Sequence, residues 1–176
     1  MLAELAGQKL RAHILTHVHP PTQGASRAIA EKFGAEIYCG AGDLRALTTG
    51  DFAYTLPKGW QNRLLTPILK GPTVSDAAPL KEGETIGNFK VFEAPGHSPG
   101  HLAFWREEDQ LLMVGDVVVN RGLWVGGRGL QQPPPVLTLD PAQNRRSAKS
   151  WPAFSLGRSA SPTANQNAQV HGLWIM

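Results

Sequence analysis

The sequence predicts an α/β domain with a partly parallel sheet. Two observations carry this prediction: a strand–helix–strand order over residues 12–38, and a set of short alternating apolar segments over residues 84–114. The chain has 176 residues, of which 41% are hydrophobic and 18% are charged. This is enough material for one domain with a sizeable core.

The N-terminal elements give the parallel part of the prediction. Leucines near helical spacing indicate the end of a helix over residues 2–10, and residues 12–15 are typical of a short buried strand. Residues 23–33 place apolar side chains four positions apart and stop at a glycine, which predicts a helix. We expect a second strand over residues 35–38 and a further helix over residues 41–47.

The next elements predict an antiparallel part. Residues 48–79 are rich in proline, and we interpret them as a long surface insert. Residues 84–93 alternate in polarity and predict a strand or a hairpin. Residues 102–105 and 111–114 predict two antiparallel strands that are joined by a charged turn.

The C-terminal part differs in composition from the rest. Residues 120–135 are rich in glycine and proline, so we expect a loop, and Asp140 with Pro141 predicts the start of a helix over residues 141–149. From Ser150 onward the chain has no acidic residue and no strong period. We expect residues 150–176 to be a disordered or non-native tail.

Composition and charge exclude several classes of protein. The net charge is +3, and residues 141–176 hold four basic residues and no acid. Four dispersed charges without interleaved aromatic residues argue against nucleic-acid binding. The single cysteine, Cys39, excludes an intrachain disulfide, and no apolar run approaches the roughly 18–20 residues that a membrane span needs. The first residues lack the apolar core of a signal peptide, so we expect a cytoplasmic protein.

Three short motifs carry candidate chemistry. His17 and His19 follow the first strand, and side chains at i and i+2 of an extended segment point to the same side, which suits a metal ion. His97 lies in a turn rich in glycine and proline, and Asp116 ends the apolar strand LLMV. Each motif has an alternative interpretation: loop histidines on the surface, a turn with solvated histidines, and an aspartate that caps a turn.

Taken together, the segments ILTHVHPPTQGAS, APGHSPGHLAF and LLMVGDVV resemble the metallo-β-lactamase-fold hydrolase superfamily. The second segment resembles the glyoxalase II-like branch in particular. The resemblance implies an αββα sandwich over residues 1–149. Family members begin with strands that precede the first histidine motif, so the resemblance implies a partial sandwich whose N-terminal strands are missing and whose chain is truncated.

The resemblance also implies a metal site. In this superfamily the motif HxHxDH supplies metal ligands; His17 and His19 match its two leading histidines, His97 matches the later histidine, and Asp116 matches the aspartate that bridges two metals. The implied zinc ion is held by these four residues, with Asp116 also catalytic. The implied reaction is hydrolysis of a small ester, thioester, lactam, lactone or phosphodiester by metal-activated water.

Two positions depart from the family motif. Pro21 and Thr22 stand where the motif has its aspartate and its third histidine. Proline offers no side-chain ligand, and the threonine hydroxyl is a poor substitute for imidazole. We therefore expect one zinc ion, an empty or weak second site and impaired activity. The alternative is an inactive fragment or pseudoenzyme whose vestigial metal site acts at most in binding.

The roles of two further histidines stay open. His101 lies four residues after His97, and it either supports the metal ligands or is purely structural. His171 is the one histidine left for the family's last ligand position, but it falls within the expected tail. The sequence also leaves the substrate and the oligomeric state open.

Overall fold

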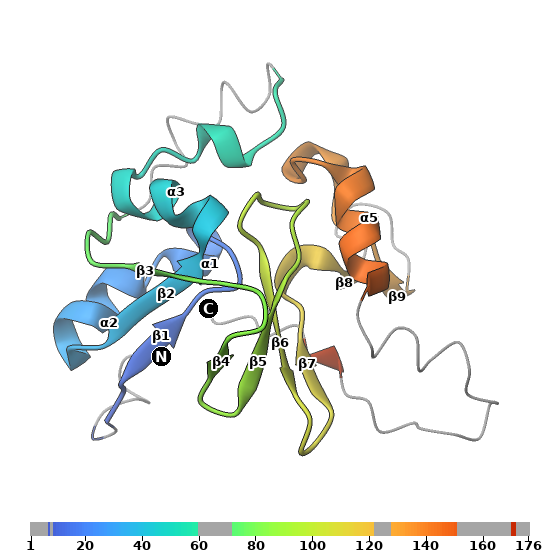
Figure 1. Cartoon of the computed structure of the whole chain (residues 1–176). Helices are drawn as coiled ribbons and strands as arrows, with labels where there is room; N and C mark the ends of the chain where they lie inside the picture. The colour runs from blue at the N-terminus through green and yellow to red at the C-terminus, as the bar shows by residue number, and fades with distance from the viewer. Residues whose placement is uncertain (1–6, 8, 60–71, 122–127, 151–169, 172–176) are drawn as a thin grey trace.

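The computed structural model describes residues 7, 9–59, 72–121, 128–150 and 170–171. Two sheets face each other, with helices α1 to α3 outside one sheet and α5 outside the other (Figure 1). This order of layers is an αββα sandwich, as the resemblance to the metallo-β-lactamase-fold superfamily implies.

The first sheet is parallel and contains three strands. Its order is β1 (Ala12–Ile14), β2 (Glu36–Gly40) and β3 (Ala78–Leu80). Parallel neighbours need crossover connections, and helices provide the one between β1 and β2. The helical segments that follow these strands are α1 (Pro20–Gln23), α2 (Ser26–Phe33), the 3-10 helix η1 (Ala41–Asp43), α3 (Leu44–Thr49) and the 3-10 helix η2 (Ala53–Thr55).

The second sheet is mostly antiparallel. Its strands are β4 (Thr85–Ile86), β5 (Phe89–Glu93), β6 (Leu102–Arg106) and β7 (Leu111–Met113), and β10 (Val170–His171) pairs in parallel with β7. A separate antiparallel pair consists of β8 (Val119–Arg121) and β9 (Arg128–Gln131). The remaining helices are the 3-10 helices η3 (Gly115–Val117) and η4 (Pro135–Leu137), and α5 (Pro141–Ser150).

Three apolar cores lie between the four layers. Successive residues of one strand reach different cores, because side chains alternate across a sheet. In β6, Leu102 and Phe104 pack between the sheets, whereas Ala103 packs on the α5 side with Ala148. In β2, Ile37 lies in the core beneath the helices of the first sheet. Strand β6 is therefore buried on both of its faces.

Most of the expected elements are present. The strands predicted over 12–15, 35–38, 84–93, 102–105 and 111–114 are all found, shifted at their ends by a few residues. The predicted helix stop is also correct, since Gly34 adopts the left-handed conformation (φ 61°) and its N–H donates to the Ala30 carbonyl. Asp140 caps α5 by accepting hydrogen bonds from the N–H groups of Ala142 and Gln143.

Three expectations need correction. The helix expected over 23–33 begins at Ser26, and the separate helix α1 precedes it because prolines fit the first positions of a helix. The expected loop over 120–135 contains β9. The proline-rich segment 48–79 is more than a surface insert: it supplies β3 and three buried apolar side chains, Phe52, Leu56 and Val74.

Some expectations fall outside the described residues. They include most of the helix expected over 2–10, part of the segment 48–79, and the tail expected over 150–176 apart from Ser150 and β10. Among the helices that the structure describes, none combines the length and apolarity needed to cross a membrane.

Candidate metal centre

Three connections bring the predicted site residues to one end of the sandwich. His17 and His19 follow β1, His97 lies between β5 and β6, and Asp116 lies in η3 after β7. Strands β5 and β7 are both antiparallel to β6, so they run in the same direction and their last residues lie at the same end of the sheet. The topology therefore gathers residues that are far apart in the sequence.

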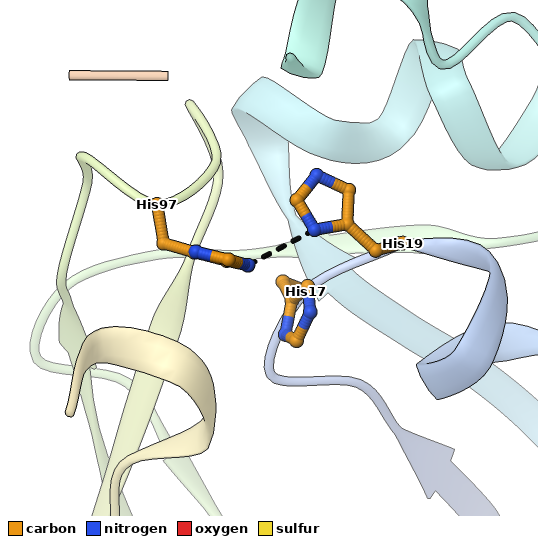
Figure 2. A group of neighbouring side chains, drawn as sticks. All are labelled: His17, His19 and His97. Atoms are coloured by element: carbon orange, nitrogen blue, oxygen red, sulfur yellow. Dashed lines mark hydrogen bonds between the residues drawn. The ribbon is translucent and has the colours of Figure 1, made fainter. Parts of the chain in front are cut away.

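The three histidines form a compact cluster. Each ring contributes one nitrogen to a set of three, and these three nitrogens all lie within 4.8 Å of one another. The rings point toward one another from two separate loops (Figure 2). Nδ1 of His19 lies 3.0 Å from Nε2 of His97. All three side chains are buried, with His19 the most accessible at 9%. A buried set of converging imidazole nitrogens is a suitable donor set for a metal ion.

Asp116 joins this cluster from the solvent side. Its Oδ2 lies 3.7 Å from Nε2 of His17 and 3.5 Å from Nε2 of His97, and its side chain keeps 34% exposure. The preceding Gly115 makes the turn into η3 with a φ of 51°. A Cβ on this glycine would lie 2.7 Å from the hydroxyl of Thr16, so the turn requires glycine. The structure thus brings all four predicted residues together, and metal binding by them remains a prediction.

Burial keeps the imidazoles neutral. It lowers the pKa of His17 well below its usual value, with repulsion from His19 and His101 adding to the effect. Burial also lowers the pKa of His19 to about 4 and that of His97 strongly. Metal binding requires the deprotonated ring, so these shifts leave the lone pairs available at neutral pH. Burial raises the pKa of Asp116, the only acid in contact with the cluster among the described residues.

A hydrogen-bond relay fixes the tautomer of His97. The hydroxyl of Thr138 donates to the Pro134 carbonyl at 2.9 Å, which leaves its oxygen to accept a hydrogen bond from Nδ1 of His97 at 3.4 Å. Nδ1 of His97 then carries the proton, and Nε2 presents its lone pair to the cluster. Outer partners of this kind commonly orient the histidines of metal sites.

Two threonines lie beside His17. The hydroxyl of Thr16 is 3.2 Å from Nδ1, and the hydroxyl of Thr22 is 3.2 Å from Nε2. Thr22 therefore lies next to the nitrogen of His17 that also faces Asp116, although its residue type is a weak ligand. Pro21 is exposed at the start of α1 and brings no donor atom to the cluster.

Asp43 forms hydrogen bonds to both histidine loops, which are the loop that carries His17 and His19 and the loop that carries His97. Its side chain is fully buried, and its carboxylate accepts hydrogen bonds from the Ser98 hydroxyl and the Gly100 N–H, both at 2.7 Å. Burial raises the pKa of Asp43 to about 6, while its hydrogen bonds, including one from the Val18 backbone, oppose that rise. Asp43 escapes prediction from the sequence, because it stands in no motif and two of its partners, Ser98 and Gly100, lie more than 50 residues away.

The remaining histidines occupy different places. His101 is fully buried, its Nε2 accepts the backbone N–H of Asp116 at 3.1 Å, and its ring stacks on that of His17. His13 lies apart from the cluster and pairs with the Ser26 hydroxyl at 3.0 Å. The backbone of His171 forms part of β10, and its side chain is outside the described residues.

An αββα sandwich with a histidine cluster at the ends of its strands defines a class of metal-binding protein, and sequence comparison places this chain within it. Residues 1–153 match the sequence profile of the metallo-beta-lactamase superfamily. The chain belongs to this superfamily. Its similarity to hydroxyacylglutathione hydrolase GloC of Haemophilus influenzae is 30% identity over 119 residues, which is 65% of this chain and 52% of that protein.

Solved structures agree with this assignment. The structure of TTHA1623 in a di-iron-bound form superimposes with a TM-score of 0.60 at 30% identity, covering 84% of this chain and 67% of the other. The B3 metallo-beta-lactamase BLEG-1 gives a TM-score of 0.56 at 25% identity, covering 81% and 63%. Two curated relatives match about two thirds of this chain, and the match spans about half of the length of each relative.

Proposed function

We propose that this chain is a metal-dependent hydrolase that holds one zinc ion with His17, His19, His97 and Asp116. The observation that carries the proposal is the convergence of three neutral imidazoles and one carboxylate at one point. The membership of the metallo-beta-lactamase superfamily supports the same conclusion. The cytoplasm is the expected location.

The donor set suits a divalent transition metal. Imidazole nitrogen binds zinc and iron well, and three histidines that leave a further position open are typical of catalytic zinc. The di-iron form of TTHA1623 makes iron the natural competitor. We propose a single ion because Pro21 has no donor atom and Thr22 offers only a neutral hydroxyl, so the positions that would hold a second ion lack strong ligands.

Each residue of the cluster has a distinct task in this proposal. The three imidazoles bind the metal, which when bound lowers the pKa of a water molecule and polarises the bond under attack. Asp116 is the group of the four that combines closeness to the cluster with exposure to solvent. Its carboxylate is placed to complete the metal site and to accept a hydrogen bond from the attacking water.

The proposed substrate is a small thioester. Four of the curated relatives are hydroxyacylglutathione hydrolases, whose name describes a thioester substrate of glutathione. Esters, lactams, lactones and phosphodiesters are the other bonds that the same site chemistry suits. The missing strong ligands at positions 21 and 22 predict a slower reaction than in a two-metal site.

Zinc titration of the metal-free chain, combined with a thioester hydrolysis assay, tests the proposal. We expect about one zinc ion per chain and measurable hydrolysis, and we expect His97→Ala to lose both. His13→Gln is the matched control, because His13 lies apart from the cluster and pairs with Ser26. Hydrolysis that persists unchanged in His97→Ala would contradict the proposed site.

Pro21 and Thr22, which stand where the family motif has an aspartate and a histidine, favour one competing function, that of a pseudoenzyme. The chain would then be a pseudoenzyme that binds metal or ligand without turnover. In that case zinc binds with a ratio of about one while none of the substrate classes is hydrolysed. Hydrolysis that depends on zinc would exclude this alternative.

A further inference from the structure

We infer that His101 is a positioning residue, whose Nε2 accepts the backbone N–H of Asp116 and thereby directs the Asp116 carboxylate toward His17 and His97. The inference rests on the proposed metal site for its functional meaning. The hydrogen bond itself is a property of the metal-free chain, so it can be tested separately.

The first evidence is the hydrogen bond and the backbone around it. The Asp116 N–H donates to Nε2 of His101 at 3.1 Å. Asp116 departs from helical geometry within η3, with φ −94° and ψ 18°, and follows the left-handed Gly115. A backbone N–H at this turn needs an acceptor, since an unpaired buried donor is costly. His101 supplies that acceptor and holds the turn that carries the carboxylate.

The second evidence is the close approach of Gly115 to the same ring. A Cβ on Gly115 would lie 2.8 Å from Nε2 of His101, which is closer than side chains tolerate. The absence of a side chain at this position is therefore what allows the ring to reach the Asp116 N–H. The His101 ring and the turn at Gly115 therefore pack closely at Nε2, the atom that accepts the hydrogen bond.

The third evidence is the position of the ring among the proposed ligands. The His101 ring stacks on that of His17, with 5.0 Å between centroids and 15° between planes. Its edge meets the ring of His97 at 5.9 Å and 85°. One side chain therefore contacts His17, His97 and Asp116, which come from three different connections. A shift of this ring would disturb three of the four proposed ligands.

The hydrogen bond also fixes the tautomer of His101. Nε2 must carry a lone pair to accept the Asp116 N–H, so the proton of the neutral ring is on Nδ1. Full burial next to other imidazoles disfavours a second proton on the ring. The acceptor role requires a lone pair on Nε2 of His101, whereas packing depends on the whole ring. The two roles can therefore be distinguished by experiment.

Two variants of His101 distinguish the two roles. His101→Gln places an amide oxygen at the depth of Nε2, whereas His101→Asn ends at the depth of Nδ1 and cannot reach the Asp116 N–H. Both variants remove the ring and its stacking on His17, so they share that loss and differ in side-chain length by one methylene group. The measurements are zinc affinity by competition with a chelator, the absorption spectrum of the Co²⁺-loaded chain, and thermal unfolding of the metal-free chain.

We expect His101→Gln to keep zinc affinity within about threefold of the unchanged chain and to keep the Co²⁺ spectrum. We expect His101→Asn to bind zinc about tenfold more weakly with an altered spectrum. We also expect it to unfold at a lower temperature than His101→Gln in the metal-free state, because the Asp116 N–H loses its acceptor. Equal losses of affinity in the two variants would show that His101 only fills space. Unchanged affinity in both would show that Asp116 does not depend on it. Either result overturns the inference.

A nitrogen-15 NMR measurement on the metal-free chain separates this inference from the proposed function. We expect the His101 ring to show a protonated Nδ1 and a scalar coupling between the Asp116 amide nitrogen and Nε2. A protonated Nε2 would overturn the inference, whatever the metal content. If the coupling is present but the unchanged chain binds no metal, the proposed function fails while the positioning of Asp116 by His101 stands.

Discussion

Replacing Asp43 with asparagine is expected to change how the stability of the metal-free chain depends on pH. Asp43 is fully buried beneath the two histidine loops, where it accepts hydrogen bonds from the Ser98 hydroxyl and the Gly100 N–H. Burial raises the pKa of Asp43 from 3.8 to about 6 in the folded chain, despite these hydrogen bonds. The asparagine side chain of the variant has a similar shape and does not titrate.

The sign of the effect follows from the proton count. Between about pH 4 and pH 6 the folded chain keeps a proton on Asp43 that the unfolded chain releases. The folded state therefore binds more protons in this window, and the Asp43 contribution to stability falls as the pH rises. A shift of roughly two pKa units corresponds to a loss of about 3 kcal/mol, complete above the folded-state pKa.

Urea unfolding of the metal-free chain between pH 4 and pH 7 measures this contribution. The buried histidines titrate in both proteins, so the difference in unfolding free energy between Asp43→Asn and the unchanged chain isolates Asp43. We expect this difference to shift in favour of the variant by about 3 kcal/mol across the window. Asp51→Asn is the control, because the Asp51 side chain keeps 43% exposure and accepts hydrogen bonds from Arg45 and the Ala53 N–H instead. Parallel curves for Asp43→Asn and the unchanged chain would refute the argument.

Three further predictions concern the metal site and the loops that support it. Changing Pro21→Asp together with Thr22→His should raise the zinc ratio from about one toward about two and increase hydrolysis, and no gain in either would favour the pseudoenzyme. Thr138→Val removes the acceptor for Nδ1 of His97, so zinc affinity measured by chelator competition should fall about tenfold; unchanged affinity would show that the relay does not matter. Gly42→Ala should cost about 1–3 kcal/mol in urea unfolding, because its Cβ would lie 2.6 Å from a backbone atom of the neighbouring histidine loop, and full stability would contradict that close packing.

The elements that could be predicted from the sequence are those with local signals. The strand before His17 has a run of apolar residues, and α2 has helical spacing and ends at Gly34. Strand β3 has no such signal, because it contains Pro79 and is defined by its pairing with β2 more than 35 residues earlier. The buried Phe52 and Val74 are equally hidden, since they lie in irregular segments without any period.

The residues of the candidate site also include some that the sequence predicts and some that it does not. His17, His19, His97 and Asp116 stand in short motifs, so the resemblance to the superfamily was sufficient to select them. Among the groups that support them, His101 stands in one of the same motifs, whereas Asp43 and Thr138 carry no motif of their own. Thr138 reaches His97 across 41 positions, and it becomes visible only once the fold brings the two loops together. Supporting residues of this kind depend on tertiary structure, and local sequence does not reveal them.

The most direct test of the account is the ratio of bound transition metal to protein, measured by elemental mass spectrometry on a folded, monodisperse sample of the chain. The account predicts a ratio near one that falls to near zero in His97→Ala and is kept in His13→Gln. A ratio near zero in the unchanged chain would mean that the cluster of His17, His19, His97 and Asp116 does not hold a metal ion. A ratio near two would mean that Pro21 and Thr22 do not prevent a second ion from binding.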